Sequence, residues 1–266
     1  MTPLLIFMGI PPATAVGTES VQILGSSVSG AMAHGIKKNI DYEIGIFLLI
    51  GGIFGSTVGV ILFNFLKESG NIDLIIKFLY ILFLAIIGTL MLVESTISLV
   101  SEKKIDPSYK KKKRTFLDYL PLKLKFRQSK IFISILLPIF VGIFVGLLSA
   151  FMGVGGGFVM VPAMIYLFGM GTVVAIGTSL FQIVFVTLNV SILHATFNYS
   201  VDLILAIFLL IGGVIGAQYG SKFTSRFKGE QIRILLALIV LIVCIMMGIE
   251  LVSEPTANSR IILQNV

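Results

Sequence analysis

Apolar runs separated by short polar segments recur along the whole chain, and their lengths predict its secondary structure. A helix that crosses a bilayer needs about 20 consecutive apolar residues. The runs that reach this length are Ala13–His34, Asp41–Leu66, Asp73–Leu99, Ile131–Met152, Thr172–Ala195, Val201–Phe223 and Gln231–Leu251. Two shorter runs, Pro3–Ile10 and Phe158–Met170, rise at most about 20 Å as helices, so neither can cross a hydrocarbon core of about 30 Å alone. We therefore predict membrane-spanning helices interrupted by two half-length helices.

The composition agrees with this pattern. Of the 266 residues, 56% are hydrophobic and 12% are charged, whereas a soluble domain averages about 25% charged residues. The mean hydropathy is +1.04. We predict an all-α polytopic protein of the cell membrane, inner or plasma, that crosses the lipid bilayer several times.

The net charge of +7 is concentrated in one segment. Between residues 101 and 130, eleven of the twenty basic residues stand against three acidic ones. This distribution is typical of a cytoplasmic loop under the positive-inside rule, and it argues against a nucleic-acid partner. We interpret residues 101–130 as a basic cytoplasmic loop. Its candidate contacts for anionic lipid headgroups are Lys110, Lys111, Lys112, Lys113 and Arg114.

The two halves of the chain repeat each other. "PLLIFMGIPPATAVGTESVQ" (residues 3–22) matches "PAMIYLFGMGTVVAIGTSLFQ" (162–182), and "FLLIGGIFG" (47–55) matches "FLLIGGVIG" (208–216). Many transporters are built from internal repeats. We expect residues 1–100 to form a first repeat, 131–252 a second repeat and 253–266 a C-terminal tail.

Basic residues at the ends of the predicted spans indicate that the repeats are inverted. The positive-inside rule places the loops near Lys37 and Lys228 on the same side as the basic loop. This is possible if Ile131–Met152 enters the membrane and Phe158–Met170 returns as a re-entrant half-helix, because a complete repeat then holds an odd number of segments. The first repeat lacks a counterpart of Ile131–Met152, since Met1 aligns with Met160. We therefore expect the complete form to continue upstream of Met1.

Four glycines interrupt the apolar run between Met152 and Phe158: Gly153, Gly155, Gly156 and Gly157. Glycine allows positive φ and close approach of the backbone. Successive N–H groups can then form an anion-binding concavity, towards which the following half-helix points its N-terminus. We predict an anion site at Gly155, Gly156 and Gly157. The alternative is that the glycines only allow close helix packing.

Polar residues inside the predicted spans are further candidates. Thr18 and Gln22 correspond to Thr178 and Gln182 in the repeat, and each pair shares a helical face at i, i+4. These neutral donors suit an oxyanion. The alternative is that they form interhelical hydrogen bonds with no role in binding.

Three ionisable residues are candidates for proton coupling: Glu19, His34 and His194. A carboxylate within a span is by default a functional hypothesis, although Glu19 also lies near a predicted helix start. The histidines end predicted spans, so we expect them at the membrane interface. Asp41 and Asp202, which follow them, are predicted to cap the next helices.

The sequence offers no sign of an enzyme. It contains one cysteine and two histidines, and no pattern typical of a metal site, a paired carboxylate or a nucleophile with its base. We expect no cofactor and no metal.

Two stretches resemble a known family. "GLLSAFMGVGGGFVMVPAMIYLFGM", followed by "AIGTS", resembles the signature of the TauE/SafE sulfite-exporter family of membrane permeases, and "AVGTES" with "IDYEIGIFLLIGGIFGSTVG" is similar to its first repeat. The resemblance implies transport of small sulfur oxyanions or organosulfonates. We expect a secondary transporter of a small anion such as sulfite, working by alternating access at the repeat interface. The alternatives are uptake of thiosulfate or another reduced sulfur species, and a membrane scaffold or sensor that docks partners on the basic loop.

The charge pattern makes a testable prediction about topology. Tyr109 and Lys228 should face the cytoplasm, and Tyr199 and Ser253 the outside. Single cysteines at these four positions, labelled with a membrane-impermeant thiol reagent, check it. Labelling of position 109 from outside would overturn the inverted arrangement.

Overall fold

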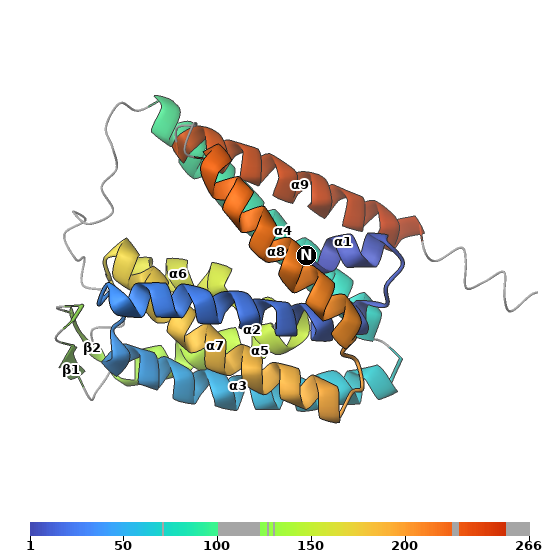
Figure 1. Cartoon of the computed structure of the whole chain (residues 1–266), viewed down its shortest axis with the longest axis horizontal. Coiled ribbons are helices and arrows are strands. Elements are labelled where there is room, and N and C mark those ends of the chain that lie inside the picture. The colour runs from blue at the N-terminus through green and yellow to red at the C-terminus, as the bar shows by residue number, and fades with distance from the viewer. Residues whose placement is uncertain (71, 101–122, 127, 130, 225–228, 254–266) are drawn as a thin grey trace, which may run out of the picture.

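The computed structural model describes residues 1–70, 72–100, 123–126, 128–129, 131–224 and 229–253. These residues form mostly helices (Figure 1). The elements are α1 (Thr2–Phe7), α2 (Pro12–Ile36), α3 (Tyr42–Glu68), α4 (Ile72–Val100), β1 (Lys123–Phe126), β2 (Ile131–Ser134), α5 (Leu136–Met152), α6 (Gly157–Tyr166), α7 (Thr172–Thr196), α8 (Leu203–Thr224) and α9 (Gly229–Ser253).

The helical elements match the predicted runs closely, and the prediction of an all-α polytopic membrane protein is confirmed. Within the described residues, four helices are long and apolar enough to cross a membrane. They lie in α3, α4, α7 and α9. The chain is a multi-pass membrane protein with the two predicted half-length helices, α1 and α6.

One predicted boundary is wrong. The helix expected from Ile131 begins at Leu136, and residues Ile131–Ser134 form strand β2 instead. The sequence of this strand alternates large β-branched and other side chains, which favours extended structure. Pro138 lies in the first turn of α5, where a missing N–H is tolerated.

The strands β1 and β2 form an antiparallel hairpin that the sequence did not predict. Lys123 pairs with Ser134 and Phe126 with Ile131. Phe126 is buried and packs edge-on against Phe47 of α3. The hairpin therefore anchors the end of the predicted basic loop to α3. The basic cluster itself, with Tyr109 and Lys228, lies outside the described residues.

Corresponding helices of the two halves pack against each other in antiparallel pairs. The start of α2 meets the segment that follows α7, where Gly17 lies against the carbonyl group of Ser200. The start of α4 contacts the end of α9 through an ion pair between Lys77 and Glu250, with Nζ and Oε1 3.1 Å apart. The α4–α9 pair crosses above the layer formed by α2, α3, α5 and α7 (Figure 1).

The most extensive helix contact joins α3 to α5, which run parallel along a seam of glycines. A Cβ at Gly51 or Gly55 would collide with the carbonyl oxygen of Ile139 or Ile143, respectively. In return, a Cβ at Gly142 or Gly146 would collide with backbone carbonyls of α3. Small residues let backbones approach closely in membranes, where packing drives helix association. The interlocked glycines therefore hold α5 in place.

The glycines of α8 that correspond to this seam are open. Gly212 and Gly216 are the repeat counterparts of Gly51 and Gly55, and a Cβ at either would meet no atom within 4 Å in the described structure. The same sequence motif is thus a packing surface on α3 and an exposed surface on α8.

This difference predicts opposite effects of one substitution at equivalent positions. Gly55→Ala should destabilise the protein by about 1–3 kcal/mol, because the methyl group overpacks against the backbone of α5. Gly216→Ala should be neutral or stabilise α8 by up to about 1 kcal/mol, because alanine has the higher helix propensity. The midpoint of thermal unfolding of the purified variants in detergent measures both. Equal destabilisation by both variants would contradict the α3–α5 seam.

Candidate functional site

The predicted break is a tight left-handed turn between α5 and α6. Gly153, Gly155 and Gly156 have φ values of +66°, +67° and +68°. This region is strained for residues with a side chain, which explains three of the four glycines. Gly157 is the first residue of α6 and does not need a positive φ.

Among the described residues, the first N–H groups of α6 have no backbone partner. The N–H groups of Val159 and Met160 both donate to the carbonyl oxygen of Gly156. The N–H groups of Gly157 and Phe158 therefore belong to the open first turn of the helix, where the helix dipole favours a negative charge. This geometry suits the anion site predicted at Gly155, Gly156 and Gly157.

The same glycines also pack closely against neighbouring helices. A Cβ at Gly155 would lie 2.8 Å from the side chains of Ile183 and Thr187 on α7, and one at Gly156 would lie 3.1 Å from the carbonyl oxygen of Val145. A Cβ at Gly157 would meet only Ile183 Cδ1, at 2.8 Å. Close packing therefore explains the glycines at 155 and 156 better than the glycine at 157. Gly157 is the position where a side chain would meet the fewest neighbouring atoms.

The carbonyl end of α5 is held by side chains from two other helices. The Tyr80 hydroxyl of α4 donates to the carbonyl oxygen of Met152, and His194 Nε2 of α7 lies 3.0 Å from the carbonyl oxygen of Ala150. His194 lies in the last turn of α7 and is fully buried among other helices. Sequence reasoning missed Tyr80, although a tyrosine hydroxyl inside an apolar run needs a partner.

Thr18 and Thr178 form matching hydrogen bonds across the two halves. Thr18 Oγ1 accepts from the N–H of Asp202 at 3.0 Å, and Thr178 Oγ1 accepts from the N–H of Asp41 at 2.9 Å. Since these contacts lie at opposite ends of the α2–α7 pair, the structure does not bring the two threonines together. Their observed contacts are hydrogen bonds between segments of the protein, which is the alternative to a role in anion binding.

Gln22 and Gln182 lie nearer the middle of the same helix pair. Each is two residues before the midpoint of its 25-residue helix. Gln22 faces Gly213, where a Cβ would lie 3.0 Å from Nε2, and Gln182 faces Gly52, where the corresponding distance is 2.7 Å. The glycines thus make room for the two amides.

Gln182 is the most unusual polar residue of the site. Its side chain is fully buried, and neither Nε2 nor Oε1 has a hydrogen-bond partner among the described residues. Ser149 of α5 is buried in the same way, with an unpartnered Oγ. Unsatisfied buried polar groups are rare and expensive. Gln182 and Ser149 are therefore candidates for binding a polar ligand, and sequence reasoning missed Ser149.

The candidates for proton coupling have different surroundings. Glu19 is buried, its Oε1 lies 3.3 Å from the amino group of Met1, and its Oε2 accepts from the N–H of Thr2. It therefore joins α2 to the start of α1. His34 is only partly buried, and its Nδ1 has no partner in the described structure.

The predicted helix caps at Asp41 and Asp202 are confirmed. Asp41 Oδ1 accepts from the N–H of Ile44 at 3.2 Å, and Asp202 Oδ1 accepts from the N–H of Leu205 at 3.0 Å. Asp41 is buried, and Ser129, which lies between β1 and β2, donates to its second oxygen from both its N–H and its hydroxyl group.

The ion pair of Lys77 with Glu250 was missed at the sequence level. Both residues lie inside predicted spans, which is by itself a signal of function or of pairing. Lys77 is buried, and the pair connects α4 to α9 one helical turn before Tyr80.

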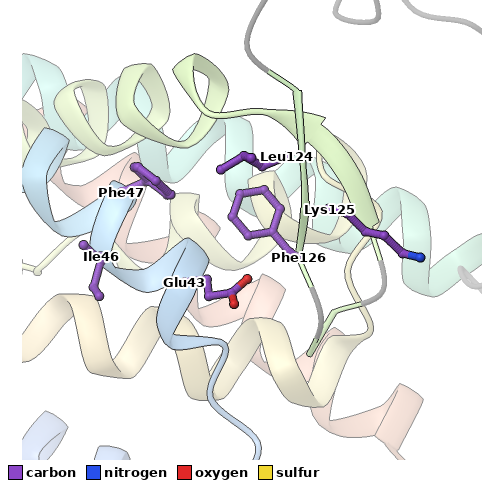
Figure 2. Close-up of a pocket in the computed structure, with 6 residues that line it drawn as sticks. All are labelled: Glu43, Ile46, Phe47, Leu124, Lys125 and Phe126. Atoms are coloured by element: carbon purple, nitrogen blue, oxygen red, sulfur yellow. The ribbon is translucent and has the colours of Figure 1, made fainter.

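A surface groove beside the hairpin contains none of the candidate residues. Leu124 and Phe126 of β1 line it together with Ile46 and Phe47 of α3, while Lys125 points away (Figure 2). Its lining is mostly apolar, with Glu43 as the acidic residue. In the described part of the chain, no group of three or more metal-ligating side chains occurs.

Comparison with known proteins identifies the family. A family model described as sulfite exporter TauE/SafE matches residues 1–247. The probable membrane transporter protein YjnA of Bacillus subtilis (strain 168) is 30% identical over 243 residues, which cover 91% of this chain and 87% of the relative. The probable membrane transporter protein YunE of the same strain is 28% identical over 254 residues, covering 94% and 84% of the two chains.

A probable membrane transporter protein of Xylella fastidiosa (strain 9a5c) is 28% identical over 240 residues, covering 86% of this chain and 77% of the relative. No solved structure gives a significant match. The family model spans both halves and the glycine turn between α5 and α6. The chain therefore belongs to the TauE/SafE sulfite exporter family.

Proposed function

We propose that the chain is a secondary transporter of a small sulfur oxyanion, such as sulfite, or of an organosulfonate. Family membership and the names of its relatives support a membrane transporter. The family description names sulfite exporters, and the substrate class proposed here follows it. Transport proceeds by alternating access of a site between the two halves.

The observation that carries the proposal is the buried, unpartnered amide of Gln182 near the middle of α7. Leaving a buried polar group without a partner costs about 1–3 kcal/mol. A bound ion or ligand that completes the hydrogen bonds is one physical reason for such a group to persist. An oxyanion bound near the membrane midplane would accept from the amide nitrogen and from N–H groups at the start of α6 during the transport cycle.

Inverted repeats form part of the proposal, and two features support them. Corresponding helices pair in antiparallel fashion, as α2 does with α7 and α4 with α9. The hydrogen bond from Asp202 N–H to Thr18 has its counterpart in the bond from Asp41 N–H to Thr178. A pseudo-two-fold axis in the membrane plane relates halves in this way, and transporters of this type bind substrate where the repeats meet.

Thiosulfate uptake would use the same site, since thiosulfate is also a small sulfur oxyanion. The scaffold hypothesis depends on the basic cluster, which lies outside the described residues. Buried polar groups near the middle of α7 favour the transporter.

The proposal predicts opposite stability effects for two amides on α7. Gln182→Met keeps the length of the side chain and removes its unpartnered polar atoms, so the folded protein should be as stable as wild type or more stable. The same variant should lose about 1–3 kcal/mol of affinity for the transported anion. Binding of sulfite, thiosulfate and a neutral control to purified protein, measured by calorimetry with thermal unfolding, tests both.

Asn189→Leu is the matched control. Asn189 Nδ2 donates to Ser56 Oγ at 2.9 Å and to Thr57 Oγ1 at 3.1 Å, so its loss should destabilise the protein. If Gln182→Met is destabilised as much as Asn189→Leu and binds anions with wild-type affinity, Gln182 is a structural residue and the proposed site is wrong.

A further inference from the structure

The C-terminal end of α5 presents a problem that the glycine turn does not solve by itself. The last carbonyl groups of a helix have no partner within that helix, and unpaired backbone groups are costly inside a membrane. The N–H of Gly153 satisfies one of them by donating to the carbonyl oxygen of Ser149 at 2.8 Å. The carbonyl groups of Ala150 and Met152 instead receive hydrogen bonds from the side chains of His194 and Tyr80.

With the Asn198 amide oriented as it is in the structure, the contacts of His194 fit a neutral ring. A carbonyl oxygen only accepts hydrogen bonds, so Nε2, 3.0 Å from the oxygen of Ala150, carries the hydrogen. Nδ1 faces Nδ2 of Asn198 at 3.0 Å, and an amide nitrogen only donates. Both nitrogens are therefore engaged by the neutral ring with its hydrogen on Nε2.

Residues of α3 fix the position of this ring. The Phe63 ring packs edge-on against His194, with ring centroids 4.6 Å apart. Lys67 Nζ donates to the carbonyl oxygen of Asn198 at 2.6 Å, and it is the charged group that approaches this cluster from α3. The chain of contacts from Lys67 through Asn198 and His194 thus ends on the carbonyl group of Ala150.

Tyr80 supplies the second contact from α4. It is 3% exposed and belongs to one buried cluster with Val16 of α2 and Met152 of α5. Gly153 in turn lies against the carbonyl group of Val16. The charged group nearest this cluster along α2 is Glu19, which is bound to the start of α1. Tyr80 therefore links the glycine turn to α4.

We propose that His194 and Tyr80 are positioning residues that hold the glycine turn through the carbonyl oxygens of Ala150 and Met152, and that His194 acts as a neutral hydrogen-bond donor and carries no transported proton. This inference rests on the proposed anion site, because the turn that the two residues hold leads into the N-terminus of α6. It assigns to Tyr80 a role that the sequence did not suggest, and it replaces the proton-coupling hypothesis for His194.

Two substitutions of His194 separate the roles of its two nitrogens. In His194→Gln the amide nitrogen reaches about as far as Nε2, so a donor to Ala150 is retained. In His194→Asn the amide reaches only about as far as Nδ1, so that donor is lost. Neither side chain titrates. Tyr80→Phe removes the donor to Met152, and Tyr166→Phe, on the exposed Tyr166 of α6, is its control.

The readout is the thiol reactivity of the turn itself. Cys244 is the only cysteine, so a Cys244→Ala background with Val154→Cys places one thiol within the turn. We expect His194→Asn and Tyr80→Phe to raise the labelling rate of this thiol by about two- to tenfold. This is the factor by which the loss of one hydrogen bond shifts the equilibrium between the closed and the open turn. His194→Gln and Tyr166→Phe should label at the rate of the background protein. The pH profile of sulfite transport should be the same in His194→Gln as in the background.

Two results would overturn the proposal. One is an unchanged labelling rate in both His194→Asn and Tyr80→Phe, which would show that these hydrogen bonds do not hold the turn. The other is a His194→Gln variant that labels like His194→Asn or loses the pH dependence of transport, which would assign His194 to proton transfer. The labelling needs no substrate, so a failure of sulfite to bind the unmodified protein would refute the proposed function without deciding this test.

Discussion

A broken helix inside a membrane must satisfy the backbone groups that the break exposes, and the rest of the structure depends on how this is done. The turn between α5 and α6 uses three glycines with positive φ and takes hydrogen-bond donors from α4 and α7 for the carbonyl end of α5. The N–H end of α6 has no backbone partner in the part of the chain that the structure describes. The break is thus satisfied on its carbonyl side by the protein and remains available on its N–H side, which is the polarity that an anion requires.

Close backbone approach is the second theme of the structure, and it explains why glycines are so frequent outside the turn. Gly51 and Gly55 let α3 meet α5 backbone to backbone, and that contact fixes the helix that carries the break. Gly17 and Gly177 play equivalent roles where α2 and α7 meet the loops of the opposite half. The exposed glycines of α8 show that the repeated sequence alone does not determine packing, since the partner helix is present on one half of the described structure and not on the other.

The sequence predicted the elements well and their contacts only in part. A helix that spans the membrane needs a continuous apolar run of about 20 residues, so the runs in the sequence show where the helices lie. The caps at Asp41 and Asp202 could be predicted because a capping side chain binds the backbone of its own helix. The hairpin was missed because strands of four residues give too short a pattern to distinguish from a loop. The repeat correctly paired Thr18 with Thr178 as equivalents. However, it could not show that each binds the backbone next to the other's helix end, because that contact depends on how the halves assemble.

The candidate site shows the same limit. The glycines of the turn and Gln182 were recognisable from their types and their place in apolar runs. The burial of His194 was not, because Phe63 and Lys67, which enclose and orient it, come from a distant part of the chain. Ser149 resembles any small residue of a packed helix, and only the structure shows that its hydroxyl lacks a partner.

The central claim is that the start of α6 binds a transported anion, and Gly157→Ala tests it most directly. The added methyl group meets only the flexible end of Ile183, so the variant should fold. The methyl group also lies beside the open N–H groups of α6, where it should hinder the approach of an anion. Uptake of radiolabelled sulfite into proteoliposomes should be saturable for the unmodified protein and reduced by tenfold or more in Gly157→Ala, about 1.4 kcal/mol or more. Gly248→Ala, with nothing within 4 Å of its added methyl group, should transport normally. Sulfite uptake by folded Gly157→Ala at the rate of Gly248→Ala would contradict the account.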